Sequence, residues 1–104
     1  MAFVLVYVTN PSLAVARRIA KHLLKKRLIA CANIFSAPVY SMYPWKGKLA
    51  QGKEWLAILK TSSRKFSQVK AEIEKMHPYE VPCIIKISAS ANKSFEKWVK
   101  ESVS

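Results

Sequence analysis

The chain has 104 residues, 51% of them apolar, and 18 Lys and Arg against six acidic residues give it a formal net charge of +12. This length and composition predict a single folded domain, residues 1–104, and exclude a disordered chain. The longest apolar run, from Phe3 to Val8, is too short to cross a membrane, and the first residues lack the basic segment and cleavage site of a signal peptide, so we expect a cytoplasmic protein.

The N-terminal part of the chain predicts a strand followed by an amphipathic helix. Residues 3–9 are apolar and rich in β-branched side chains, as in a central strand buried on both faces. Asn10 and Pro11 then predict the N-cap and the first residue of a helix. Apolar residues recur at helical spacing as far as Leu24, and basic residues occupy the other face. His22 lies among these lysines and is expected to face solvent.

A long hairpin is predicted next. Residues 28–43 indicate an extended second strand, bent at Pro38 and closed by Pro44. A turn-rich segment, 47–53, leads into a third strand at 54–61. We expect the second and third strands to pair with each other.

The remaining elements complete a familiar order. Two serines at 62–63 predict the cap of a second helix, which must end near His77 because Pro78 follows. A fourth strand is expected at 81–88, and a short final helix opens at 92–94. The order βαββαβ with an additional C-terminal helix predicts an α+β, ferredoxin-like sandwich.

The predicted second strand is longer than the domain that must hold it. It would extend about 50 Å at about 3.3 Å per residue, whereas a domain of this size is about 35 Å across. The hairpin should therefore overhang the domain, and its apolar side chains need cover that the chain itself cannot supply. A second copy of the chain is the simplest cover, so the geometry predicts self-assembly. The side chains concerned are Phe35, Val39, Tyr40, Met42, Tyr43, Trp45 and Leu49.

Three short segments carry a resemblance to a known family. The sequence His-Pro-Tyr-Glu-Val-Pro runs from His77 to Pro82, and its prolines favour a stiff, extended backbone. Together with residues 30–33 and 45–48, it resembles the CutA divalent-cation-tolerance family, and the resemblance extends from Val8 to Trp98. It implies a ferredoxin-like homotrimer with strands paired across subunits. The implied role is tolerance of divalent metal ions, copper above all.

The resemblance also implies a metal site built from His77, Glu80 and Cys31, the last from a neighbouring subunit. Imidazole with carboxylate suits copper, zinc or nickel, and cysteine sulfur favours copper(I). Some family members carry two further donors where this chain has Val8 and Met76. Copper or another divalent ion is the expected ligand, and folding should not require it. The alternative for His77 is a cation that ends a helix.

The chain offers little for catalysis. It contains no Asp and only two separated histidines, so no set of nucleophile, base and orienting group can be assembled. Cys31 and Cys83 have neither zinc-site spacing nor a disulfide framework and are expected to be free thiols. We therefore expect a protein that is not an enzyme.

Three further functions stay open. An intersubunit cleft would support small-ligand signalling like that of the PII trimers, or a protein-scaffold role; its expected lining residues are Trp45, Lys46, Lys60 and Tyr79. RNA binding is the third alternative, since the positive charge suits it and Trp55 lies on the third strand. The aromatic signature of RNA recognition motifs is missing there, so nucleic acid is not an expected partner.

Overall fold

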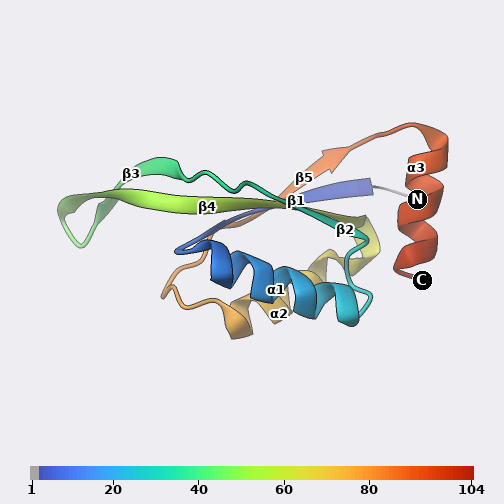
Figure 1. Cartoon of the computed structure of the whole chain (residues 1–104), viewed down its shortest axis with the longest axis horizontal. Coiled ribbons are helices and arrows are strands. Elements are labelled where there is room, and N and C mark those ends of the chain that lie inside the picture. Colours follow the sequence, from blue (N-terminus) through green and yellow to red (C-terminus); the bar gives the residue numbers. More distant parts are fainter. Residues whose placement is uncertain (1–2) are drawn as a thin grey trace.

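One antiparallel sheet with two helices on one face forms the body of the protein, and a third helix lies at one end (Figure 1). The structure is a computed structural model and describes residues 3–104. Its strands are β1 (Phe3–Asn10), β2 (Cys31–Ile34), β3 (Val39–Trp45), β4 (Lys48–Ser62) and β5 (Ile84–Ala89). Its helices are α1 (Leu13–Lys25), the 3₁₀ turn η1 (Ser63–Lys65), α2 (Phe66–Met76) and α3 (Lys93–Ser102).

The strand order confirms the ferredoxin-like prediction. The main sheet runs β2-β4-β1-β5, and β1 pairs antiparallel with both of its neighbours. Val6, for example, lies opposite Leu59 on β4 and Lys86 on β5. β2 and β5 are therefore the two edges of this sheet, so Cys31 and Cys83 stay apart as free cysteines.

The core lies between the sheet and the helices α1 and α2. Alternate residues of β1 point to this side, as a period of two requires, and they pack against apolar residues of both helices. All of them are at most 3% exposed: Val4, Val6, Val8, Ile19, Leu23, Val69 and Ile73. On the opposite face of the sheet, α3 covers the start of β1, where the Phe95 ring lies 5.9 Å from the Phe3 ring, and Ile85 and Ile87 of β5 remain 47% and 43% exposed.

The start of α1 differs from the prediction. Ser12, not Asn10, is the N-cap, and its side chain accepts a hydrogen bond from the backbone N–H of Val15 at 3.1 Å. Asn10 is still part of β1, paired with Trp55 and 1% exposed. The strand runs one residue further than its apolar pattern indicates, and this displaces the cap.

The end of α1 is a Schellman motif. The N–H of Leu28 binds the carbonyl of Leu23, and the N–H of Arg27 binds the carbonyl of Leu24, both at 3.0 Å. Arg27 occupies the left-handed position with φ of 58°, where glycine is the usual residue. Leu23 and Leu28 both belong to the core, so the motif turns the chain from the helix directly into packed structure.

His22 is not the free, solvent-facing residue that the sequence predicts. Its Nε2 atom lies 2.7 Å from Oε1 of Glu72 on α2, and its side chain is one-third exposed. Glu72 also lies 3.2 Å from the amino groups of Lys26 and Lys75. The contact therefore ties the two helices together.

The hairpin is present, but its strands are divided differently. The predicted strand at 28–43 is two strands, because the chain leaves the sheet after Ile34 and β3 begins only after Pro38, which has no N–H to donate. The predicted turn at 47–53 is also wrong. Lys46 and Gly47 alone make the turn, with φ of 51° and 80°, as in two-residue type I′ hairpins. Pairing therefore resumes at Lys48.

The hairpin overhangs the main sheet, as predicted. Within residues 3–104, β3 pairs with β4 alone, and the molecule measures 45 × 24 × 23 Å. Figure 1 shows the hairpin extending along the long axis beyond the helices. Tyr40, Met42 and Leu49 are 64%, 61% and 69% exposed on it.

The last elements lie near their predicted places. α2 ends at Met76, one residue before His77, as the following proline requires. β5 begins at Ile84 rather than at residue 81, because Pro82 interrupts the donor pattern of a strand. Residues 77–83 are therefore a loop that leads from α2 back to the sheet edge.

Candidate functional site

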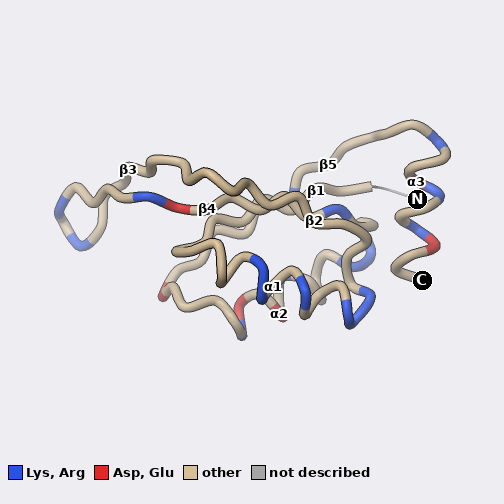
Figure 2. Tube along the Cα trace, viewed as in Figure 1, with Lys and Arg blue, Asp and Glu red and all other residues tan. Residues whose placement is uncertain are grey.

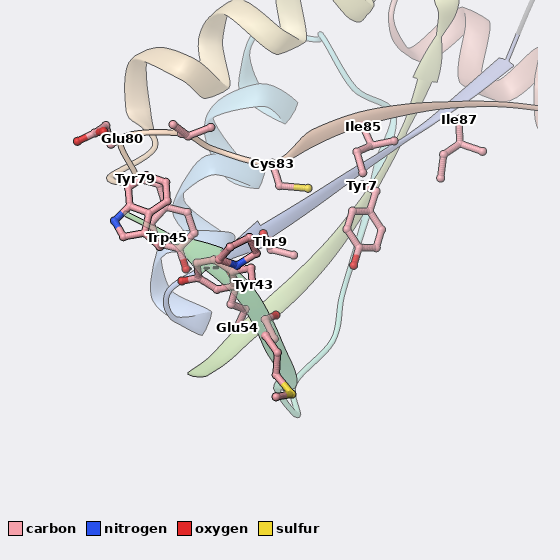
Figure 3. Close-up of a pocket in the computed structure, with 14 residues that line it drawn as sticks. Tyr7, Thr9, Tyr43, Trp45, Glu54, Tyr79, Glu80, Cys83, Ile85 and Ile87 are labelled. Carbon is pink, nitrogen blue, oxygen red and sulfur yellow. Dashed lines mark hydrogen bonds between the residues drawn. The ribbon is translucent and has the colours of Figure 1, made fainter. Parts of the chain in front are cut away.

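A cavity of about 840 Å³ lies where the hairpin meets β1 and the β5 edge, on the face of the sheet away from α1 and α2 (Figure 3). In Figure 3, Tyr43, Trp45, Tyr79 and Glu54 gather at one end, whereas Tyr7, Ile85 and Ile87 lie towards the other. The full lining is Tyr7, Thr9, Ser41, Met42, Tyr43, Pro44, Trp45, Glu54, Tyr79, Glu80, Val81, Cys83, Ile85 and Ile87. The cavity is therefore mainly aromatic and aliphatic, with a few polar groups.

Tyr79 and Glu54 form the main polar contact in this cavity. The Tyr79 hydroxyl donates a hydrogen bond to Oε2 of Glu54 at 2.8 Å. Burial raises the pKa of the Tyr79 phenol, and the adjacent Glu54 carboxylate raises it further. The phenol therefore keeps its proton and stays a donor, which holds the carboxylate in place.

His77 fixes the loop that carries Tyr79. Its Nε2 atom lies 2.9 Å from the carbonyl oxygen of Thr9, and the backbone N–H of Tyr79 donates to its Nδ1 at 3.2 Å. A carbonyl can only accept, so the ring carries its proton on Nε2. The side chain is 7% exposed, and its ring centre lies 4.7 Å from that of Tyr79. His77 thus positions the loop through both of its nitrogens.

The predicted metal ligands are not brought together within one chain. Cys31 lies opposite Lys60, level with Leu5 of β1, whereas His77 contacts Thr9. Four residues of strand separate these levels by about 13 Å. Glu80 is exposed in the loop after α2. Among residues 3–104, no three His, Cys or acidic side chains form a group that could hold a metal ion.

A family model places this architecture among known proteins. The model for the CutA1 divalent ion tolerance protein matches residues 4–102. The chain belongs to the CutA1 family. The divalent-cation tolerance proteins CutA of Archaeoglobus fulgidus and Thermotoga maritima are 46% and 43% identical to it, over 94% and 96% of the chain and 95% and 98% of their own lengths.

Solved structures of the family share the fold. The structure of the periplasmic divalent cation tolerance protein CutA from Archaeoglobus fulgidus superposes with a TM-score of 0.94 at 44% identity, covering 98% of this chain and 99% of that one. The family model and these relatives describe CutA1 as a family of divalent-cation tolerance proteins. The shared structure confirms the predicted α+β fold. None of the helices within residues 3–104 is long and apolar enough to span a membrane.

The residues predicted to line a ligand cleft divide into two pairs in this CutA1 chain. Trp45 and Tyr79 both line the cavity. Lys46 does not, although its amino group lies 5.7 Å from the centre of the Trp45 ring. Lys60 reaches the other end of the sheet, where its amino group lies 5.4 Å from the Phe95 ring of α3. Trp45 and Tyr79 thus lie together within one chain and the two lysines lie elsewhere, and the intersubunit cleft stays a prediction.

Sequence reasoning missed Glu54 and Cys83 as cavity residues. Cys83 is half-buried, and burial raises the pKa of its thiol. Glu54 is the only acidic residue in any described strand of the chain, which was the available signal. The predicted turn at 47–53 puts Glu54 at the start of a strand, whereas the observed turn at Lys46 and Gly47 puts it inside the hairpin, opposite Val39.

Proposed function

We propose that this CutA1-family chain acts in divalent-cation tolerance as a non-enzymatic homotrimer that binds copper or another divalent metal ion between subunits. The observation that carries the assembly is the bare hairpin. Tyr40, Met42 and Leu49 are each more than 60% exposed on a ribbon that pairs with β4 alone in the described chain. Exposed apolar surface of this extent is typical of interaction sites.

A shared metal site would draw on side chains at the periphery of the subunit. Cys31 lies on the edge strand β2 and Glu80 lies on an exposed loop, so both can meet a neighbouring subunit. His77 could ligate a metal only by giving up its bond to Thr9 or to Tyr79. Thiolate and carboxylate are therefore the donors that the structure leaves most accessible, and sulfur favours copper(I).

Light scattering tests the assembly. We expect three times the mass of one chain, and a smaller assembly for Leu49→Lys, which places a charge on the exposed hairpin. Leu24→Lys is the matched control, because Leu24 is an exposed leucine on α1. A wild-type mass of a single chain would contradict the proposal.

Copper titration by calorimetry tests the metal site. Cys31→Ser and Glu80→Gln should each weaken copper uptake, whereas Cys83→Ser and Glu74→Gln should leave it unchanged. If the first pair takes up copper as wild type does, the proposed ligands are wrong.

A further inference from the structure

We propose that the exposed face of α1 and of the turn after it binds the phosphate backbone of duplex nucleic acid without reading its sequence. The proposal goes beyond metal tolerance and uses none of the proposed metal ligands. It concerns the helix layer, on the side of the sheet away from the cavity. Five exposed cations form this basic face: Arg17, Arg18, Lys21, Lys25 and Arg27.

Positive charge is concentrated along α1 and its final turn. From Arg17 to Arg27 the chain places six exposed Lys and Arg in eleven residues, with no acidic residue among them, and Figure 2 shows this charge along α1 and in the turn that follows. Arg17, Lys21 and Lys25 recur every four residues, so they form one stripe that extends about 12 Å along the helix. Each strand of a duplex has a phosphate about every 3.4 Å along its axis, so the stripe can face three or four of them.

The charges of the basic face are not neutralised by ion pairs within the chain. The ion pairs formed within residues 3–104 all involve Glu72, and their cations are His22, Lys26 and Lys75. None of the five residues of the basic face takes part. Like charges four residues apart destabilise a helix, and an anionic partner would remove this repulsion.

The arginines of the chain are confined to the helix layer. Of the 18 basic residues only four are arginines, and they lie on α1, in the turn after it and in η1, which leads into α2: Arg17, Arg18, Arg27 and Arg64. The guanidinium group binds phosphate oxygens through two parallel N–H donors, whereas the lysine ammonium acts as a point charge. A row of cations that includes arginines therefore suits a polymer of phosphates.

Arg27 holds its place in a conformation that is unfavourable for its residue type. Its φ of 58° lies in the left-handed region, where glycine is the usual residue. Its side chain is exposed and forms no ion pair within residues 3–104. Non-glycine residues in this conformation are concentrated at functional sites. A cation here extends the charged surface of α1 beyond the end of the helix.

The surroundings of the basic face favour a duplex over a single strand or a membrane. Single strands stack their bases on aromatic side chains, and the large exposed aromatic residues of the described chain lie before or on β3 and on α3. A helix on a membrane buries its apolar face in lipid, whereas the apolar face of α1 is packed in the core. Duplex binding requires only cations along the phosphates.

Self-assembly should leave the basic face open. The apolar residues that need cover lie on the overhanging hairpin and not on this face. A second copy placed against α1 would bring a chain with 18 basic and only six acidic residues, and like charges oppose such a contact. A trimer would then present three basic faces to one duplex, which raises its avidity.

A fluorescent DNA duplex of about 20 base pairs tests the proposal by anisotropy on the full-length protein. The double variant Lys21→Gln/Lys25→Gln should bind about tenfold or more weakly in about 100 mM salt, because phosphate contacts are lost. The matched control Lys97→Gln/Lys100→Gln removes two exposed lysines from α3 and has the same net charge. It should lose about twofold at most, since salt screens distant charges. An equal loss in both variants, or no binding by wild type, would overturn the proposal.

Arg27→Gly separates the loss of a charge from a loss of folding. This variant should bind the duplex several-fold more weakly and yet be no less stable in denaturation, because glycine suits the left-handed position. Wild-type affinity in this variant would contradict the role assigned to the turn.

Other ligands decide the class of partner. A duplex of different sequence should bind equally, and the slope of log K against log salt should be at least about −4 for five phosphate contacts. A preference above about tenfold for one duplex would show base readout and overturn the proposal, as would tighter binding of the single strand or of phosphatidylserine vesicles. Copper uptake and the mass in light scattering should be unchanged in all these variants, so a failure here is distinct from a failure of the metal proposal.

Discussion

The His22 ring nitrogen Nε2 lies 2.7 Å from Oε1 of Glu72 and joins α1 to α2 across fifty positions of sequence. The Glu72 carboxylate also forms ion pairs with the amino groups of Lys26 and Lys75, each at 3.2 Å. These contacts, the His22 bond first and then Lys75 and Lys26, lower the pKa of the Glu72 carboxyl from 4.5 to about 2. The contacts of Glu72 with His22 and Lys26 thus link α2 to the end of α1 at the surface of the helix layer, beside the apolar core.

Replacing Glu72 by Gln should make the thermal stability of the protein less dependent on pH. A carboxyl whose pKa is lower in the folded protein stabilises it fully above the unfolded value of 4.5, and this stabilisation disappears as pH falls to about 2. The variant should therefore melt at a lower temperature than wild type at pH 7. The difference should shrink below pH 4.5 and vanish near pH 2. Thermal melts across this range check it, with Glu74→Gln as control; a difference independent of pH would contradict the charge explanation.

Arg27→Gly should raise the free energy of unfolding. Arg27 has φ of 58°, a conformation that costs a non-glycine residue about 1–2 kcal/mol, while glycine loses part of that gain through its freer unfolded chain. We expect a net gain of up to about 1 kcal/mol in chemical denaturation at matched protein concentration. Lys25→Gly, two residues earlier and still within α1, should instead lower the free energy of unfolding by about 1 kcal/mol. A loss in both variants would count against the strain.

The two glycines of the hairpin should respond differently to alanine. A Cβ atom at Gly47 or at Gly52 would meet nothing within 4 Å, so neither change creates a clash. Only Gly47 has a positive φ, of 80°. Gly47→Ala should therefore cost about 1 kcal/mol or more in unfolding free energy, and Gly52→Ala should be neutral or slightly stabilising. Equal effects in denaturation curves would argue against the two-residue turn.

His77→Ala should destabilise the protein without any metal present. It would leave the buried Thr9 carbonyl without its donor and release the N–H of Tyr79. Loss of a buried partner typically costs about 1–3 kcal/mol. Denaturation in the presence of a chelator measures this. His77→Phe keeps a ring beside Tyr79 but lacks both nitrogens, so a Phe variant as stable as wild type would show that packing alone matters.

The order of elements and the overhang were predictable because they depend on local patterns. A continuous run of apolar, β-branched residues marked β1, helical spacing marked α1, and Pro78 set the end of α2. The predicted second strand is longer than the expected diameter of the domain, and this comparison was enough to place the hairpin outside the main sheet. Each of these inferences uses neighbours in sequence only.

The composition of the cavity was not predictable in the same way. Glu54 reaches Tyr79 only because the turn is at Lys46 and Gly47, and a turn elsewhere would change its partner on β3. Lys60 turns to Phe95 because α3 packs at that end of β4, which no pattern in the strand reveals. The two bonds of His77 likewise depend on where the loop meets β1.

The fifteen residues of β4 contain two populations of backbone amides. Residues 55–62 pair with β1, and part of this stretch also pairs with β2, whereas residues 48–54 pair within the described chain with β3 alone. Hydrogen exchange should therefore be slow in the first group and governed by global unfolding, and faster in the second, which opens with the hairpin. Amide exchange in this one strand thus reports both global unfolding and opening of the hairpin. Dilution of the assembly should speed exchange at residues 48–54 before it affects residues 55–62.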